Sequence, residues 1–305
     1  MTNSKSTRRE RTDVYDLVTN TIIERLEQGF IPWKKPWAMQ GAARNFISDK
    51  PYKGINAMIL NGIYKSPFFL TLKQANSLGG KIKKGSRSLP VTFWSKYYTH
   101  RETGAKLTEE QARAIPKNLV KTRSFLKYYR VFNATNITGI EFPRWKPQVI
   151  SEADRIDRCE DTVRQMPLKP VIRHEGNQAY YAPMADMVTM PDIETFFNTE
   201  GYYQTLFHEL AHSTGHHKRL KRKTIQEQSR FGSEDYSFEE LIAEFTASFV
   251  SNTLELQNAQ VLENSAAYIQ NWLSVLKDDK TMLVRASAFA QKAADWILNE
   301  SKVTA

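Results

Sequence analysis

The sequence predicts an α+β protein with two domains, an N-terminal mixed α+β domain and a C-terminal, mostly helical domain with a small sheet. A chain of 305 residues exceeds what one hydrophobic core usually serves. The charge is also divided, because residues 1–150 hold 27 Lys and Arg against 10 Asp and Glu, net +17, and residues 151–305 hold 16 against 23, net −7. Strand-like and helix-like patterns mix in the first half, and helical patterns dominate the second.

The first half begins with residues 1–11, which read as a disordered basic arm. Apolar residues at helical spacing predict a helix over 13–28, and a short helix is expected near 71–78. The runs LPVTFWSKYYTH (89–100) and FLKYYRVFNA (125–134) are typical of strands joined through a glycine-containing turn and a short helix.

The domain boundary is predicted within residues 141–154, where two prolines coincide with the change in charge. We expect a first domain over 12–146 and a second over 147–305. The second should contain a helix over 152–165, short strands, a histidine-bearing helix and then further helices. The start of the chain lacks an apolar signal region, and no run of about 18 apolar residues occurs, so we expect a cytoplasmic protein without a membrane span.

The stretch HELAH places His208 and His212 four residues apart, so both imidazoles lie on one face of a helix and can hold one metal ion. Glu209 occupies the position of the general base in zinc hydrolases that use this motif. In YSFEELIAEF, Glu240 is the preferred third ligand, with Glu244 one turn on as a partner that orients a ligand histidine; Glu244 is also the second candidate for the ligand itself. The alternatives are a surface helix with satisfied histidines and a capping role for Glu240.

Other ligand types are disfavoured by the sequence. The single cysteine, Cys159, excludes an intramolecular disulfide and a cysteine-rich zinc cluster. A third histidine ligand in the H-E-x-x-H-x-x-G-x-x-H pattern would fall at position 218, which is Lys218. His216 and His217 are therefore interpreted as outer or surface groups.

The first half interleaves aromatic and cationic residues, as in WKKPW, KIKKGSR and FWSKYY. Any base can stack on an aromatic ring and any phosphate can pair with a cation, so this pattern favours single-stranded DNA. The alternatives are that Trp33 and Trp37 fill a turn against the core and that Lys81 to Arg87 form a solvated turn. The residues predicted to contact DNA are Trp33, Lys34, Lys35, Trp37, Lys53, Lys81, Lys83, Lys84, Arg87, Trp94 and Lys96.

Nearly the whole chain resembles the ArdC-type antirestriction proteins of conjugative plasmids and other mobile elements. The resemblance rests on FIPWKKPW, PYKGINAMIL and TLKQANSLGGKIKKGSRSLPVTFW in the first half, and on LFHELAHSTGHHKRLKR and FGSEDYSFEELIAEFTASF in the second. A similar first domain also occurs in TraC-type plasmid primases. Where the family has His-Trp-Thr-Gly-His, this chain has Ser213 in place of the tryptophan.

The resemblance implies an N-terminal domain that binds single-stranded DNA and a C-terminal zincin-like metallopeptidase domain. It assigns His208, His212 and Glu240 as ligands and Glu209 as the base. The implied role is protection of incoming DNA from host restriction. Zn²⁺ is the expected ion, and Mn²⁺ or another divalent transition metal also suits two histidines and a carboxylate.

Two hypotheses remain open at this point. In the first, the metal site cleaves a peptide or protein such as a restriction-system subunit, with the strand Met187–Met190 pairing with the extended substrate. In the second, the protein is a non-catalytic single-stranded-DNA-binding protein whose metal is structural, and protection comes from masking DNA or docking to the restriction enzyme.

Overall fold

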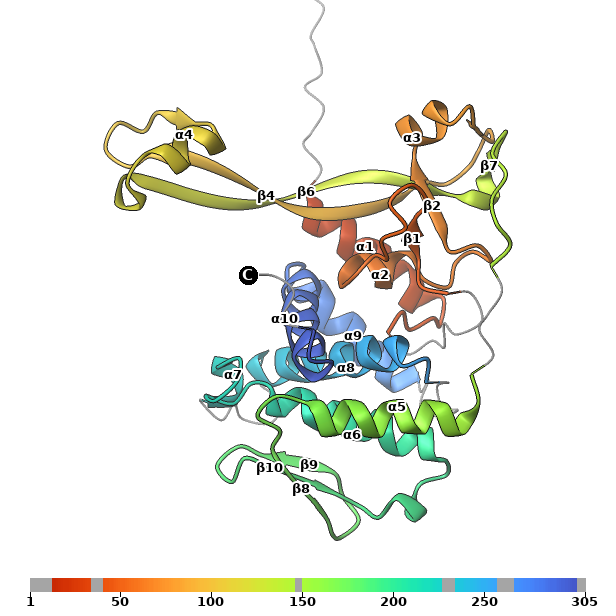
Figure 1. Cartoon of the computed structure of the whole chain (residues 1–305), viewed down its shortest axis with the longest axis vertical. Coiled ribbons are helices and arrows are strands. Elements are labelled where there is room, and N and C mark those ends of the chain that lie inside the picture. Colours follow the sequence, from red (N-terminus) through yellow and green to blue (C-terminus); the bar gives the residue numbers. More distant parts are fainter. Residues whose placement is uncertain (1–12, 34–40, 146–149, 227–233, 257–265, 301–305) are drawn as a thin grey trace, which may run out of the picture.

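The structure is a computed structural model that describes residues 13–33, 41–145, 150–226, 234–256 and 266–300. It confirms the predicted α+β fold, with a mixed N-terminal domain and a mostly helical C-terminal domain (Figure 1). Of the residues predicted to contact DNA, Lys34, Lys35 and Trp37 lie outside the described residues, as does the arm at 1–11.

The N-terminal domain is built on a five-stranded sheet. In spatial order its strands are β1 (Arg44–Asn45), β2 (Phe68–Thr71), β6 (Val120–Asn133), β4 (Leu89–His100) and β5 (Lys106–Leu107). β1 runs parallel to β2, and the other neighbours are antiparallel. β4 and β6 form a long two-stranded ribbon that projects from the body of the molecule (Figure 1).

The remaining elements of this domain are mostly short. They are α1 (Val14–Glu27), α2 (Ile55–Leu60), α3 (Leu72–Ser77), β3 (Lys81–Ile82), α4 (Glu109–Ala114), the 3-10 helices η1 (Lys117–Leu119) and η2 (Ala134–Asn136), and β7 (Ile137–Thr138). The predicted helices near 13–28 and 71–78 are thus confirmed. α1 begins after Asp13, whose side chain accepts a hydrogen bond from the Tyr15 backbone. β3 pairs with β7, and α4 lies at the free end of the ribbon.

The C-terminal domain consists mainly of helices. Its elements are α5 (Glu152–Gln165), β8 (Val171–His174), β9 (Tyr180–Ala182), β10 (Met187–Met190), the 3-10 helix η3 (Ile193–Thr195), α6 (Thr199–Ser213), α7 (Lys223–Gln226), α8 (Glu234–Thr253), α9 (Ala266–Asp278) and α10 (Met282–Ile297). α8 packs between α6 and α10. Within the described ranges, no helix has both the length and the apolar composition that crossing a membrane requires.

The small sheet corrects the prediction that β10 receives an extended substrate. Its strand order is β8-β10-β9, so β10 is the central strand. β8 pairs with one side of β10 in parallel and β9 with the other side in antiparallel fashion. Both edges of β10 are occupied, and its backbone has no free side for another strand.

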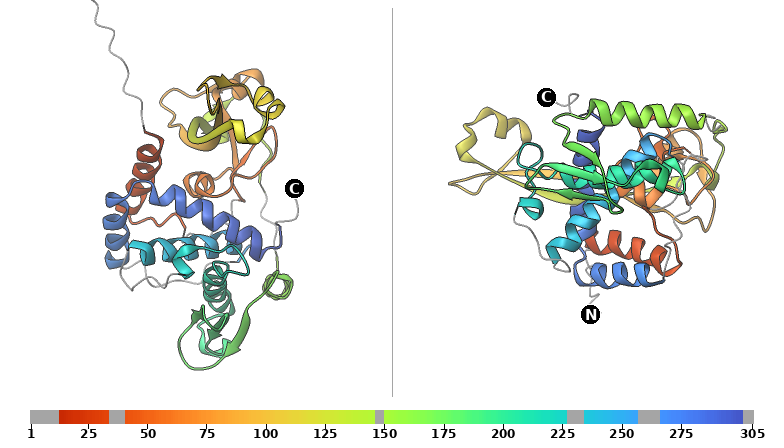
Figure 2. Two further views of the ribbon diagram at one scale, coloured as in Figure 1. Left: turned by 90° about the vertical axis from the view of Figure 1, so that its left-hand side faces the viewer. Right: turned by 90° about the horizontal axis from the view of Figure 1, so that it is seen from below.

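The two halves of the chain share one hydrophobic core. α1 lies against α9 and α10 in both views of Figure 2. The Thr19 hydroxyl donates to the backbone carbonyl of Lys280, 2.7 Å away, and the Lys280 ammonium lies 2.9 Å from Asp16. Val18 and Ile22 of α1 belong to the same buried cluster as Leu283 of α10. The N-terminal helix is therefore anchored on the C-terminal domain.

Trp33 also belongs to this core, which corrects its prediction as a DNA-stacking residue. Its side chain is 3% exposed. The indole ring packs edge-on against Phe245 of α8 at 5.1 Å and against Trp272 of α9 at 6.1 Å. An aromatic ring buried on this scale stabilises the core and cannot stack on a base.

Candidate metal centre and nucleic-acid interface

α6 presents the two histidines of the HELAH stretch at its C-terminal end. The helix begins after Asn198, whose side chain accepts a hydrogen bond from the Gly201 backbone at 2.7 Å. Leu206, Phe207 and Leu210 form its buried side. Because that side is fixed in the core, His208 and His212 face away from it together, with ring centroids 4.8 Å apart.

α8 brings a carboxylate to these histidines, as the sequence predicted for Glu240. The Glu240 oxygens lie 3.5 Å from His208 Nε2 and 3.5 Å from His212 Nε2, and the two Nε2 atoms are 3.1 Å apart. A tetrahedral ion with bonds of about 2.1 Å separates its ligand atoms by about 3.4 Å. Each histidine lies near a different Glu240 oxygen, and one ligand atom from each of the three residues can be chosen so that all lie within 4.8 Å of one another. This arrangement fits one divalent ion and leaves a fourth position for another ligand.

The electrostatics of the centre favour positive charge. Burial alone would lower the pKa of His208. Hydrogen bonding to Glu240 and the nearby Glu244 and Glu209 carboxylates together outweigh this effect and raise the pKa to about 9. Three carboxylates thus surround one imidazole. A divalent cation would satisfy the same carboxylates without a proton on His208.

A second layer of contacts, which the sequence did not predict, orients His212. Glu239 Oε1 lies 3.4 Å from His212 Nδ1, the ring nitrogen that faces away from Glu240. Arg222 donates to both oxygens of Glu239, at 2.5 and 3.0 Å, and also to the Ala211 carbonyl in the last turn of α6, at 2.8 Å. Burial raises the pKa of Glu239, but Arg222 and His212 lower it to about 2, so the carboxylate is charged.

Glu209, Glu244 and Tyr236 complete the surroundings of the centre. Glu209 is 8% exposed, and Glu244 is half-buried. Tyr236, in the first turn of α8, was not singled out by the sequence; burial and the Glu240 and Glu209 carboxylates raise its pKa. Glu239, not Glu244, is the carboxylate within hydrogen-bond reach of His212, whereas the orienting role predicted for Glu244 stays a prediction.

His216 lies outside the metal centre and packs in a buried cluster of polar side chains. It is 7% exposed, and its Nδ1 atom lies 3.5 Å from Asp186. Asp186 also pairs with the fully buried side chain of Arg219 and accepts a hydrogen bond from Tyr181. The cluster fastens the segment after α6 to the turn between β9 and β10. The basic run KRLKRK at 218–223 therefore contains two buried structural arginines, Arg219 and Arg222.

One face of the β4–β6 ribbon carries a row of aromatic and cationic residues, interrupted on β4 by Ser95. Its members are Tyr129, Phe93, Lys127, Phe125, Tyr97 and Arg123. Phe93 and Tyr129 have ring centroids 5.9 Å apart, and Tyr97 and Phe125 are 5.8 Å apart. Lys127 lies 4.9 Å above the Phe125 ring. Except for the half-buried Phe125, the row is exposed.

The described residues that the sequence predicted to contact DNA are dispersed. Trp94, 52% exposed, and Lys96 lie on the ribbon face opposite the row, since strand residues alternate. Lys81, Lys83, Lys84 and Arg87 are exposed around β3, where Arg87 pairs with Glu24 at 2.6 Å. Lys53 pairs with Asp295 and Glu300 at 3.4 and 3.0 Å, so two carboxylates compete with any phosphate for its ammonium.

Two families match the chain. The family described as the N-terminal domain of anti-restriction factor ArdC matches residues 12–132, and the zincin-like metallopeptidase family matches residues 158–289. Among solved structures, the metal-free antirestriction ArdC protein from plasmid R388 is 33% identical, with a TM-score of 0.71 over 95% of this chain and 97% of that one. Its Mn(II)-bound structure is also 33% identical, with a TM-score of 0.69 over 96% and 100%.

Curated relatives match over both halves together. An uncharacterised protein, y4eC of Sinorhizobium fredii, is 32% identical over 295 residues, which is 94% of this chain and 92% of the relative. Two DNA primases TraC of Escherichia coli are 30% and 31% identical over 93% of this chain. The matched region spans 20% and 27% of those primases, which are much longer proteins.

Proposed function

Because the chain belongs to the ArdC family of antirestriction proteins, we propose that it protects incoming DNA of a mobile element from host restriction by combining single-stranded-DNA binding with a metallopeptidase site. The observation that carries this proposal is the convergence of His208, His212 and Glu240 within one metal-ligand distance range. The ribbon face described above supports the DNA-binding part. Host restriction acts in the cytoplasm, where we expect the protein to work.

For the metal centre, we propose His208, His212 and Glu240 as ligands of Zn²⁺ or Mn²⁺. The bound ion would supply a Lewis acid that polarises a peptide carbonyl. Glu209 would accept a proton from the attacking water and return it to the leaving amine. Glu239, held by Arg222, would accept a hydrogen bond from His212 Nδ1 and so leave the Nε2 lone pair free to bind the ion. The protein substrate would be a component of the restriction system.

Glu209→Gln separates the catalytic hypothesis from the purely binding one. The substitution preserves shape and removes the basic oxygen, so protection of transferred, unmethylated DNA should fall to the level without the protein. Single-strand affinity should stay within about twofold of wild type, because Glu209 is not on the ribbon. The protein should still bind the metal, with affinity lowered by less than about tenfold, because Glu209 is a nearby charge and not a proposed ligand.

The assay is transfer of unmethylated DNA into a restricting host that expresses each variant, with Glu194→Gln in η3 as a matched control. Full protection by Glu209→Gln would refute the peptidase mechanism. In that case, protection by masking DNA or by docking to the restriction enzyme would explain the function.

For DNA, we propose that single strands bind along the row from Tyr129 to Arg123. Pairs of rings offer faces on which bases of any sequence can stack, and Lys127 and Arg123 can pair with phosphates. The row is open to a ligand, because all its side chains except the half-buried Phe125 are exposed. Affinity should fall steeply with salt because cations on the strand are released on binding.

Replacing Tyr97 and Phe125 together by alanine should weaken single-strand binding by about tenfold or more, since each stacked base contributes about 1–3 kcal/mol. Trp94→Ala on the opposite ribbon face is the matched control, because it removes an exposed ring from the same strand. Fluorescence anisotropy with labelled oligonucleotides at several salt concentrations measures both. A larger loss for Trp94→Ala than for the double variant would place the DNA on the other face.

A further inference from the structure

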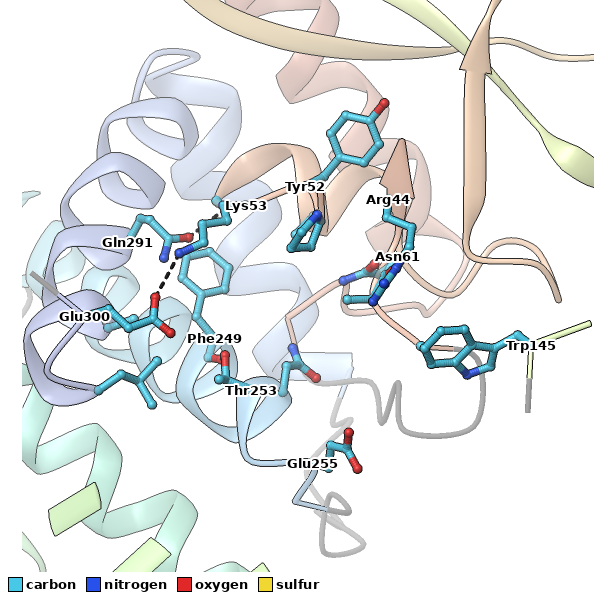
Figure 3. Close-up of a pocket in the computed structure, with 18 residues that line it drawn as sticks. Arg44, Tyr52, Lys53, Asn61, Trp145, Phe249, Thr253, Glu255, Gln291 and Glu300 are labelled. Atoms are coloured by element: carbon cyan, nitrogen blue, oxygen red, sulfur yellow. Dashed lines mark hydrogen bonds and ion pairs between the residues drawn. The ribbon is translucent and has the colours of Figure 1, made fainter. Parts of the chain in front are cut away.

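A pocket of about 320 Å³ lies at the junction of the two halves of the chain. Its size is at the lower end of small-molecule sites, which span about 300–1,000 Å³. Arg44, Asn61 and Trp145 line one side, and Phe249 of α8 and Gln291 of α10 line the other (Figure 3). The metal centre contributes no residue to it.

Contacts between the halves hold the walls of the pocket in place. The Gly54 backbone donates to Gln291 Oε1 at 2.9 Å, next to the Lys53 pairs with Asp295 and Glu300. The Trp145 ring occupies the space that a Cβ at Gly41 would take, 2.4 Å from the nearest ring atom. The Arg44 Cζ atom lies over this ring, 5.1 Å from its centroid. The pocket is therefore built from packed groups.

The charges of the pocket disfavour a phosphate. Its two cations are already neutralised, because Arg44 pairs with Asp49 at 3.2 Å and Lys53 pairs with two carboxylates. At the lower edge in Figure 3, the Glu255 carboxylate makes no hydrogen bond or ion pair with the described residues. A neutral ligand that donates hydrogen bonds fits this balance better than an anion.

The remaining lining suits a flat heterocycle. The Trp145 and Phe249 rings offer flat apolar surface, and the Arg44 guanidinium lies over the Trp145 ring. The amides of Asn61 and Asn252 offer hydrogen bonds at the edge of a ring. Unstacked bases are recognised by this combination of aromatic or guanidinium planes and edge hydrogen bonds.

Tyr52 connects the pocket to the ribbon. It lines the pocket, and its ring points out of it, toward the strands at the top of Figure 3. The helix α2, which supplies Ala57 to the pocket, is joined to the ribbon, because the Asn56 side-chain amide donates to the Thr92 carbonyl of β4 at 2.8 Å. Thr92 directly precedes Phe93 of the row, so one end of the row lies next to a helix that lines the pocket.

We propose that this pocket receives one unstacked base of the bound single strand, and that it prefers a base with an exocyclic amino group, which donates to Glu255. This inference rests on the proposed binding of single-stranded DNA. Cytosine and thymine provide a matched comparison, because the position that carries the N4 amino donor in cytosine carries the O4 acceptor in thymine.

The test compares oligo(dC) with oligo(dT), each about 12 nucleotides long, by fluorescence anisotropy. The full chain should bind oligo(dC) about five- to tenfold more tightly, the scale of one well-placed base contact. Ala57→Phe fills the pocket from α2, and Glu255→Gln removes the acceptor charge; each should make the two affinities equal. Ala153→Phe on the exposed face of α5 is the matched control and should keep the difference.

The outcomes separate the pocket from the ribbon. The base pocket would be refuted if the full chain bound both oligomers with equal, salt-sensitive affinity, or if the difference persisted in Ala57→Phe. Either result would still be consistent with DNA binding along the ribbon. If neither oligomer binds, the proposed DNA function fails, and deoxycytidine alone tests the pocket by calorimetry. If deoxycytidine binds the wild-type chain and not Ala57→Phe, the pocket is a site for a free nucleoside. If deoxycytidine does not bind the wild-type chain, the pocket is refuted as a base site.

Discussion

Arg222→Met is expected to destabilise the folded protein by about 3–5 kcal/mol, because it leaves the Glu239 carboxylate buried without its cation. The two side chains are 3% and 6% exposed, so water cannot replace the lost contact. The same change removes the donor to the Ala211 carbonyl and to the Thr214 hydroxyl at the end of α6. Urea unfolding at fixed metal concentration measures the loss.

Two further variants establish the cause of this loss. Arg285→Met removes an arginine whose side chain is 56% exposed and should cost less than about 1 kcal/mol. Adding Glu239→Gln to Arg222→Met should recover part of the stability, since it removes the unpaired buried charge. If Arg222→Met alone costs no more than Arg285→Met, the buried pair does not hold the end of α6 in place.

Glu240→Ala is expected to lower the affinity for Zn²⁺ or Mn²⁺ by more than about 100-fold, because it removes one of three protein ligands. Glu244→Ala should lower it by less than about tenfold, since it removes a nearby negative charge and no ligand atom. The pair is matched, as both are glutamates of α8 one turn apart and half-buried.

For both variants, the bound metal is measured after dialysis, and the metal affinity is measured by competition with a chromophoric chelator. Circular dichroism of the metal-free proteins controls for folding. Loss of metal in Glu244→Ala with normal content in Glu240→Ala would reassign the third ligand to Glu244.

The sequence predicted those parts of the site that depend on spacing within one helix. His208 and His212 share a face because four residues make about one helical turn, and the same periodicity selected Glu240 on α8. The pair of Arg222 and Glu239 could not be found in this way, because Arg222 lies in a loop and Glu239 lies in α8, 17 residues further along the chain. The basic run at 218–223 does not itself indicate which of its side chains are buried.

The ribbon and Trp33 show two other limits. The segment KTRS at 121–124 is polar, yet it continues β6, since a projecting two-stranded ribbon exposes both faces and needs no apolar alternation. Trp33 belongs to the sequence IPWKKPW, which is rich in lysine and proline, and an aromatic residue in such a segment suggests a stacking platform. Its burial depends on Phe245 and Trp272, more than 200 residues away, and local sequence does not contain that information.

The packing of α1 on α9 and α10 has an evolutionary consequence. Recombination that exchanged only the first half of the chain would separate α1 and Trp33 from the partners that bury them, and the hybrid would lose core contacts on both sides. Inheritance of the whole unit avoids that loss. The matches to the two primases agree with this constraint, because each extends over 295 residues and includes both halves.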